Sequence, residues 1–444
     1  MPTFQSLQCG RTEVSSLEPL RALLALQSLG CWGTPVSSLE PLCALPSLQS
    51  LDCAFTPVTS LDPLRALPSL QSLDCPGTKV TDADALLQLP DLSRLSFRGC
   101  QLTSLPLALV FKASLESLHL HGAVVRGIPR EVLSQSPYEN CLEGLRAHVR
   151  DLDAGAEQVR ETKVIALGNG RVGKTQICRR LRNMPFDPSI ASTHGISVTT
   201  VSWDGTSTGE RLNLWDFGGQ DIYHGAHSLF MRTQAVFLVV WHPDLERREE
   251  EQHEGLVFRN YPLAYWLEYV RTLGRPGSPI IVVQSQCDRR EHEVKRPPVD
   301  DRFLDDPALK LCWHSAAKDR GQAALNEAIR DAVEMIRERD GVATIGAGRA
   351  RIVRQLEGWR DADQGLERSA REHRTLLLQE FNALCERAGG VSSPESLLDY
   401  LHNLGVVFHQ AMAEIALCEL RLRCGCVWRI VSHTNRVVAP RKAS

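Results

Sequence analysis

The chain has 444 residues, enough for about three domains, and its formal net charge of −3 is spread over 23% charged residues of both signs. That balance argues against a nucleic-acid-binding protein or a polybasic membrane anchor. The N-terminus lacks a basic segment followed by an apolar one, the apolar runs are only strand-length, and the 14 cysteines form no compact disulfide framework. We therefore expect a cytoplasmic protein with reduced thiols, no membrane insertion and no nucleic-acid partner.

Leucines recur every 22 residues at the start of the chain. They are Leu7, Leu29, Leu51, Leu73 and Leu95, and two positions after each stands Cys9, Cys31, Cys53, Cys75 or Phe97. This period is typical of leucine-rich repeats, in which both positions of each strand face the core. We assign residues 1–135 to such a solenoid, whose concave face would bind an unidentified protein, and 136–160 to a helical connector.

A GxxxxGKT motif follows the apolar run 163–167 and precedes a helical segment. Its members are Gly168, Asn169, Gly170, Arg171, Val172, Gly173, Lys174 and Thr175. Glycines let backbone N–H groups turn inward around a nucleotide's phosphates, Lys174 adds a positive charge, and the Thr175 hydroxyl can ligate Mg²⁺. The strand before the motif and the helix after it make a phosphate-binding loop far more probable than a chance glycine turn.

A second motif of the DxxGQ type stands some forty residues downstream, after a β-type run. Asp216 would complete the Mg²⁺ site, Gly219 can offer its N–H to a γ-phosphate, and Gln220 can orient an attacking water. Between the two motifs, Thr193 lies in a proline-bearing loop and is our candidate for a switch residue that joins the metal and the γ-phosphate. Gln220 and Thr193 are thus the expected catalytic residues.

The base should be selected by the loops after the last two strands. Ser285, Gln286 and Asp288 follow the apolar run 279–284 and resemble the Asn-Lys-x-Asp motif of small GTPases, with only the carboxylate retained. The resemblance implies that Asp288 accepts hydrogen bonds from guanine. Guanine is then favoured more weakly than by the full motif. Ser315 and Ala316 occupy a position similar to the loop that presents backbone N–H to the guanine carbonyl.

Residues 216–241, from Asp-Phe-Gly-Gly-Gln-Asp-Ile-Tyr-His through Ala-Val-Phe-Leu-Val-Val-Trp, resemble the Roc domain, the Ras-like GTPase of the Roco family. The order of repeats, GTPase and a COR-like segment agrees with that family. Strands expected near 163, 198, 211, 235, 279 and 310 alternate with helices near 174, 223, 262 and 321. This alternation predicts a doubly wound α/β P-loop GTPase over 161–339, with the charged stretch 246–254 as a solvated segment.

Residues 340–444 are expected to form a small α/β COR segment. Helical spacing from 374 to 385 is followed by a helix capped by Ser393 and Pro394, and this helix with residues 397–409 resembles the helix-then-strand opening of COR. The sequence after His409 no longer follows that pattern and suggests a truncated or altered end. An intact COR would support homodimerisation.

The resemblance implies a slow, Mg²⁺-dependent GTPase that binds GTP and GDP, in which nucleotide state controls dimerisation or partner binding. Two other classes stay open. One is a non-catalytic interaction scaffold, favoured by the altered residues Ser285 and Gln286, and the other is an ATP-using P-loop NTPase.

Overall fold

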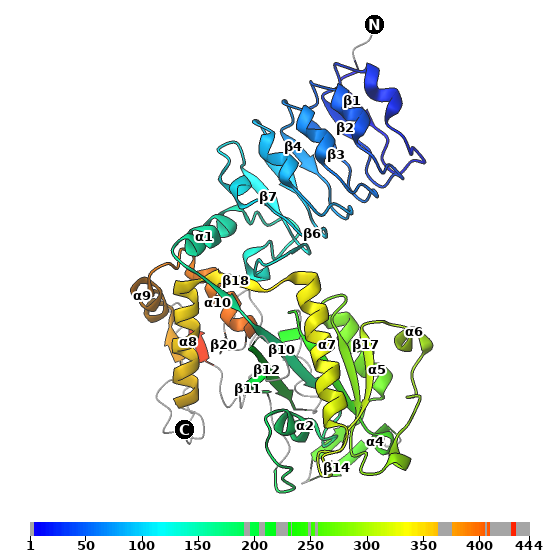
Figure 1. The fold of residues 1–444 in the computed structure, drawn as a ribbon, viewed down its shortest axis with the longest axis vertical. Helices are drawn as coiled ribbons and strands as arrows, with labels where there is room; N and C mark the ends of the chain where they lie inside the picture. The colour runs from blue at the N-terminus through cyan, green and yellow to red at the C-terminus, as the bar shows by residue number, and fades with distance from the viewer. Residues whose placement is uncertain are drawn as a thin grey trace, which may run out of the picture. The chain divides into compact units, whose positions relative to one another are not determined.

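The computed structural model describes residues 4–190, 196–203, 209–218, 230–231, 233–246, 250–253, 256–362, 375–404, 406–408 and 428–431. The chain forms two compact units (Figure 1). The first consists of Met1–Val159, Asp340–Ile352 and Phe381–Tyr400. The second consists of Arg160–Arg339, Val353–Glu380 and Leu401–Ser444.

The first unit begins with a parallel sheet of short strands, one from each repeat. These strands are β1 (Ser6–Gln8), β2 (Ser28–Gly30), β3 (Ser50–Asp52), β4 (Ser72–Asp74), β5 (Arg94–Ser96) and β7 (Ser117–His119). Leucines pair with leucines across the register, as in Leu29 with Leu51. Because side chains alternate along a strand, Leu51 and Cys53 point to the same side, and both are buried. The predicted solenoid and its cysteine-lined core are therefore confirmed.

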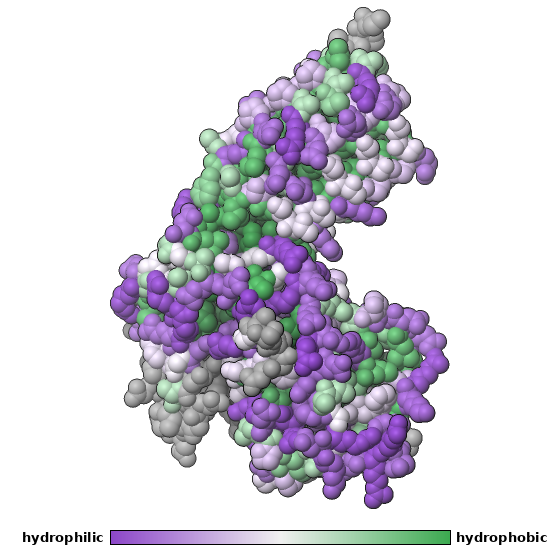
Figure 2. All heavy atoms as spheres, viewed as in Figure 1, coloured by the Kyte–Doolittle hydropathy of each residue, from purple (hydrophilic) through white to green (hydrophobic). Residues whose placement is uncertain are grey.

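Each repeat returns through a short helix on the opposite side from the strands. These 3-10 helices are η1 (Glu18–Ala22), η2 (Glu40–Ala44), η3 (Asp62–Ala66), η4 (Asp84–Gln88) and η5 (Leu107–Phe111). Three of them carry a proline in the first turn, where its missing N–H costs no hydrogen bond. Figure 2 shows mostly polar residues, with smaller apolar areas, on the visible face of the repeats. The leucines are buried between strands and helices, as a solenoid requires.

The last repeats add β6 (Gln101–Leu102), β8 (Val124–Val125) and η6 (Arg130–Val132), and are followed by α1 (Leu142–Asp153). The expected helical connector is thus partly a strand, because β9 (Ala156–Val159) follows α1 and pairs antiparallel with β18 (Ala343–Gly346). Asp151 of α1 and Arg349 at the start of α8 (Ala347–Ala362) form a fully buried ion pair at 2.6 Å. The N–H of Ser392 also donates to Asp151, at 2.6 Å.

The second unit contains a six-stranded sheet in the order β11-β12-β10-β13-β16-β17. The strands are β10 (Glu161–Leu167), β11 (Ile196–Trp203), β12 (Glu210–Phe217), β13 (Val236–Trp241), β16 (Ile280–Gln284) and β17 (Leu309–Trp313). Only β11 runs antiparallel to its neighbour. The helices are α2 (Lys174–Leu181), α4 (Pro243–Glu246), α5 (Leu263–Leu273), η8 (Arg290–His292), α6 (Asp301–Leu304) and α7 (Gln322–Asp340). The six predicted strands are all present.

Apolar clusters cover both faces of this sheet. Helices α2 and α7 contribute to one cluster, for example through Ile177 and Ile329. The other contains α5, with Trp266 and Val270. Buried strands with helices on both sides are the mark of a doubly wound fold, and they place the carboxyl ends of the parallel strands at one edge. The expected helix near 223 lies outside the described residues.

Two segments differ from the sequence-based expectation. Part of the stretch taken as a solvated segment forms a hairpin, because β14 (Glu250–His253) pairs antiparallel with β15 (Leu256–Arg259). Near the C-terminus, β19 (Thr375–Leu377), β21 (Trp428–Val431) and β20 (Val407–Phe408) form a parallel sheet with β21 in the centre. Residues 428–431, where we expected the sequence to diverge, thus complete this sheet. The remaining helices are α9 (Leu378–Ala388) and α10 (Pro394–Leu404).

Candidate nucleotide-binding site

The phosphate loop connects β10 to α2 and is shaped by residues with left-handed backbone. Gly168 has φ 136°, and a Cβ there would lie 2.1 Å from the carbonyl oxygen of Val240, so only glycine fits. Gly173, at φ 101°, is the N-cap of α2, and Arg171 also has a positive φ of 59°. The first N–H groups of α2 therefore follow a tight turn, which is the arrangement that binds phosphate at a helix N-terminus.

Lys174 is buried at the start of α2 and is held by the loop itself. Its Nζ donates to the carbonyl oxygens of Gly168, at 2.9 Å, and of Asn169, at 2.7 Å. Burial lowers the pKa of Lys174 to about 8, and the nearby carboxylate of Asp216 opposes that lowering. An ammonium group in so dry a position interacts strongly with an incoming anion, because the surrounding protein screens it poorly.

Thr175 and Asp216, the two predicted metal ligands in the described part of the chain, are in contact. Thr175 Oγ1 donates to Asp216 Oδ2 at 2.7 Å, across the carboxyl ends of β10 and β12. Asp216 is only 5% exposed. A hydroxyl and a carboxylate oxygen are the hard donors that Mg²⁺ prefers, so the residues present fit that ion. The remaining predicted residues here, Thr193, Gly219 and Gln220, lie outside the described residues.

The two predicted base-binding loops are joined by hydrogen bonds. Ser315 Oγ donates to Asp288 Oδ1 at 2.5 Å, and the N–H of Cys287 donates to the carbonyl of His314 at 3.1 Å. Asp288 is exposed at the rim, and Ala316 beside Ser315 is half-buried. This arrangement presents one oriented carboxylate in the loop that follows β16.

Ser285 and Gln286 lie differently from each other. Ser285 is buried, and its hydroxyl donates to the carbonyl of Trp241 at 3.2 Å. A Cβ on Gly173 would lie 3.7 Å from the Cβ of Ser285, so Ser285 faces the phosphate loop. Gln286 is exposed and has a positive φ of 58°. The structure therefore brings Ser285 against the phosphate loop and leaves Gln286 at the surface beside Asp288.

Two contacts at this edge carried no signal in the sequence motifs. The side chain of Asn169 is hydrogen-bonded to Tyr261, just before α5, and to Trp266 within α5. An ion pair joins Arg180 of α2 to Asp319 in the loop after β17. The residues in each contact are far apart in the sequence and belong to no common motif, so only the fold brings them together.

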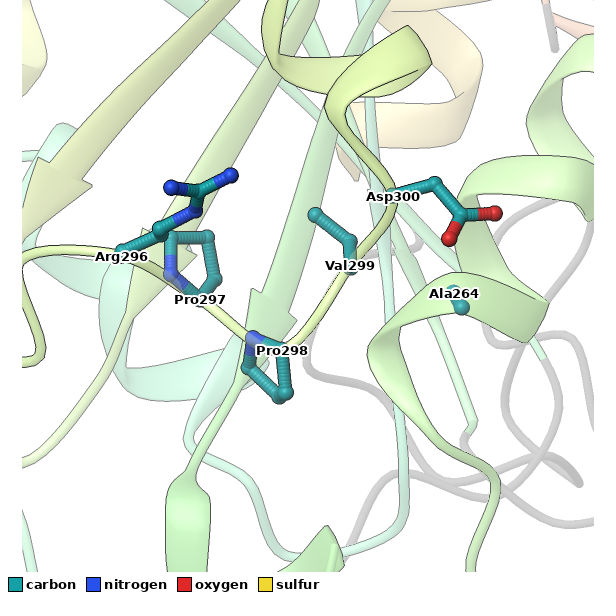
Figure 3. A pocket seen from close by; sticks show the side chains of 6 residues that line it. All are labelled: Ala264, Arg296, Pro297, Pro298, Val299 and Asp300. Atoms are coloured by element: carbon teal, nitrogen blue, oxygen red, sulfur yellow. The ribbon is translucent and has the colours of Figure 1, made fainter.

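A shallow hollow of about 520 Å³ lies elsewhere on the second unit. It is lined by Ala264 of α5 and by Arg296, Pro297, Pro298, Val299 and Asp300 (Figure 3). None of these residues belongs to the phosphate loop or to the base-binding loops. The hollow is therefore separate from the candidate nucleotide site.

Residues 163–288 match the family model described as "Ras of Complex, Roc, domain of DAPkinase". The matched range begins in β10 and ends at Asp288, so it contains the phosphate loop, Asp216 and the first base-binding loop. The match thus covers the same edge of the sheet that the geometry singles out.

Relatives and a solved structure are similar over longer stretches. A probable serine/threonine-protein kinase, pats1 of Dictyostelium discoideum, is 26% identical over 262 residues, which are 53% of this chain and 8% of the relative. A Roc-COR-CHAT protease from an unknown prokaryotic organism is 24% identical over 331 residues, 70% of this chain and 29% of the relative. The chain therefore spans less than a third of the length of either.

The GDP-bound RocCORdC structure of Methanosarcina barkeri Roco2 aligns with a TM-score of 0.43 and 24% identity, over 57% of this chain and 70% of that one. No helix among the described residues is long and apolar enough to cross a membrane. Leucine-rich repeats ahead of a segment that matches the Roc model, and relatives that join Roc to COR, together support a Roco family protein.

Proposed function

We propose that the chain binds GTP and GDP at the edge of the six-stranded sheet and hydrolyses GTP slowly. The observation that carries this proposal is the contact between Thr175 of the phosphate loop and Asp216 at the end of β12, 2.7 Å apart. These groups belong to two separate motifs, and together they provide the donor set for a phosphate-bound Mg²⁺. The nucleotide-bound metal would neutralise charge on the β- and γ-phosphates, and Thr175 and Asp216 would hold it.

In this proposal the loop residues 168–175 cradle the phosphates with their N–H groups. Lys174 would direct its ammonium to the outer phosphates while its two carbonyl partners keep it in place. Asp288, oriented by Ser315, would accept hydrogen bonds from the guanine ring, and Ala316 would offer its backbone N–H to the guanine carbonyl. Ser285 would support the phosphate loop from behind, and Gln286 would border the base.

Turnover would depend on Gln220, which would orient the attacking water, and on Thr193, which would join the metal and the γ-phosphate in the triphosphate state. Gly219 would donate its N–H to the γ-phosphate. Ras-like domains without an added arginine hydrolyse GTP at a rate on the order of 10⁻⁴ s⁻¹. We expect a rate of that order here.

We further propose that nucleotide state controls dimerisation through the COR segment, or binding of a partner, and that the repeats bind an unidentified protein. The domains would be repeats over 1–135, a connector over 136–160, Roc over 161–339 and COR over 340–444, in a cytoplasmic protein. A purely non-catalytic scaffold is the second candidate. It is favoured by Ser285, because its buried hydroxyl cannot replace the base contacts of an amide.

The test is phosphate release under multiple turnover with GTP and with ATP, in Mg²⁺ and in EDTA. The proposal expects slow Mg²⁺-dependent release from GTP, a large reduction in Gln220→Leu, and loss of binding in folded Lys174→Ala protein. Tight GTP binding without release would support the scaffold, and faster release from ATP would support an ATP-using enzyme. Unchanged GTP affinity in folded Lys174→Ala protein would refute the site.

A further inference from the structure

The side chain of Asn169 makes three hydrogen bonds to one neighbouring segment. Nδ2 donates to the carbonyl of Tyr261 at 2.8 Å, and Oδ1 accepts from the Tyr261 N–H at 2.9 Å. Oδ1 also accepts from Trp266 Nε1 at 3.0 Å. Asn169 is 4% exposed and Trp266 is 1% exposed. The amide thus bonds both backbone groups of one residue, as an adjacent strand would, and a buried indole as well.

The main chain of Asn169 faces a different partner. Its carbonyl oxygen accepts from Lys174 Nζ at 2.7 Å, so the residue connects the proposed phosphate-binding ammonium to Tyr261 and Trp266. Gly168 and Gly170 flank it, and neither has a side chain that could hold the turn. Asn169 is therefore the only side chain in the turn from 168 to 170. Its amide ties that turn to Tyr261 and Trp266.

The segment at the other end of this contact is itself well anchored. Tyr261 follows β15, the second strand of the hairpin, and precedes Pro262, the N-cap of α5. The ring of Tyr261 packs edge-on against Trp266 with centroids 6.2 Å apart, and the carboxylate of Glu246 accepts from the Leu263 N–H. A shift of the phosphate loop would therefore meet resistance from the start of α5 and from the end of the hairpin.

We propose that Asn169 is a positioning residue that holds the phosphate loop in its nucleotide-binding shape by clamping it to Tyr261 and Trp266. The inference rests on the proposed function, and it assigns the side chain of Asn169 a task other than touching the nucleotide. Coupling is reciprocal, so the clamp also makes nucleotide occupancy stabilise residues 256–266.

Three variants test the clamp through the dissociation rate of a fluorescent GDP analogue. Asn169→Ala removes all three bonds, and Trp266→Phe removes the indole N–H together with part of the ring while leaving the loop sequence intact. The matched control is Asn213→Ala. Asn213 is 2% exposed and bonds Glu161 at 3.1 Å and Thr200 at 2.8 Å, but it lies in the middle of β12, away from the loop.

We expect GDP to dissociate about fivefold faster or more from Asn169→Ala, less so from Trp266→Phe, and at the wild-type rate from Asn213→Ala. Hydrogen exchange adds a second readout. GDP should protect both α2 and residues 256–266 in wild type, and in Asn169→Ala it should protect α2 alone. A general loss of stability would also occur in Asn213→Ala. Loss of GDP protection at residues 256–266 in Asn169→Ala alone therefore indicates positioning.

Equal GDP dissociation rates in wild type, Asn169→Ala and Trp266→Phe would overturn the inference and leave the nucleotide site standing. The same holds if GDP still protects residues 256–266 in Asn169→Ala. If Asn169→Ala does not fold, Trp266→Phe decides, and a wild-type rate there overturns the clamp. Failure of the proposed function looks different, because wild-type protein would then bind no GDP at all.

Discussion

Thr175 Oγ1 lies 2.7 Å from Asp216 Oδ2 and donates a hydrogen bond to it. We expect both oxygens to hold Mg²⁺ when nucleotide binds. Thr175→Ala should then reduce the factor by which Mg²⁺ raises GTP affinity by about tenfold or more. Thr175→Ser keeps the hydroxyl and should keep the gain. Titrations with and without EDTA measure it, and a full Mg²⁺ effect in Thr175→Ala would remove Thr175 from the metal site.

Burial lowers the pKa of Lys174 from 10.5 to about 8, so the nucleotide-free protein should have an unusual pH dependence. Between pH 8 and 10.5 the unfolded chain holds a proton on this lysine that the folded chain has lost. The unfolded state then binds more protons, and the free energy of unfolding rises with pH through that window. The rise is on the order of 3 kcal/mol.

Urea unfolding of wild type and Lys174→Met at several pH values isolates this contribution. Buried thiols away from this lysine, such as Cys75, whose pKa is raised by burial, lower stability at alkaline pH in both proteins and cancel in the comparison. The free energy of unfolding of wild type, relative to that of Lys174→Met, should increase as the pH rises above 8. A difference independent of pH would mean that Lys174 keeps its ordinary pKa.

Asp288 should decide between guanine and adenine. Asp288→Asn removes the charge from its hydrogen bonds to the base, each worth about 1.5–3 kcal/mol, and should reduce the preference for GTP over ATP at least tenfold. Ser315→Ala removes the 2.5 Å bond that orients the carboxylate, along with the bond that the hydroxyl accepts from the Lys318 N–H at 3.1 Å, and should have a smaller effect. Competition binding measures both variants, and an unchanged preference in Asp288→Asn would refute this role.

In the repeats, Gly77 and Gly99 both have positive φ, 65° and 72°, yet only one of them is crowded. A Cβ on Gly77 would lie 2.6 Å from Cδ1 of Phe55, whereas nothing approaches a Cβ on Gly99 closer than 4.0 Å. Gly99→Ala should therefore cost about 1–2 kcal/mol for the left-handed backbone alone, and Gly77→Ala should cost more.

The Phe55→Gly background separates the two causes. Removing the ring should bring the cost of Gly77→Ala down to that of Gly99→Ala, because only the backbone penalty is left. Thermal or urea unfolding of the four single and double variants supplies the numbers. Equal costs for the two glycines in the presence of Phe55 would show that the ring moves aside freely.

The sequence predicted the features that repeat or that depend on local chemistry. The 22-residue period located the solenoid strands, and the motif around Gly168 and Lys174 located the phosphate loop. Leucine periodicity and glycine turns act within a few residues, so they can be recognised before the fold is known.

Features that depend on distant pairing could not be predicted. Even the local hairpin at Glu250–His253 escaped prediction, because its first strand is a charged sequence with little β-propensity and is recognisable only by its pairing with Leu256–Arg259. The direction of the Asn169 side chain is invisible in a motif that treats its position as variable. Strand Trp428–Val431 is recognisable as a strand only beside β19 and β20.

The antiparallel pairing of β9 with β18 has a mechanical consequence. Residues 160–339 leave the first unit at Val159 and return at Asp340, and Val159 is paired directly with Ala343. The carbonyl of Asp340 also accepts from the N–H of Gly127 in the last repeat. A pulling force applied before Ala156 and after Gly346 would act at one end of this strand pair, because these two residues are paired, and would open its bonds one after another. While these bonds hold, residues 160–339 do not carry that load.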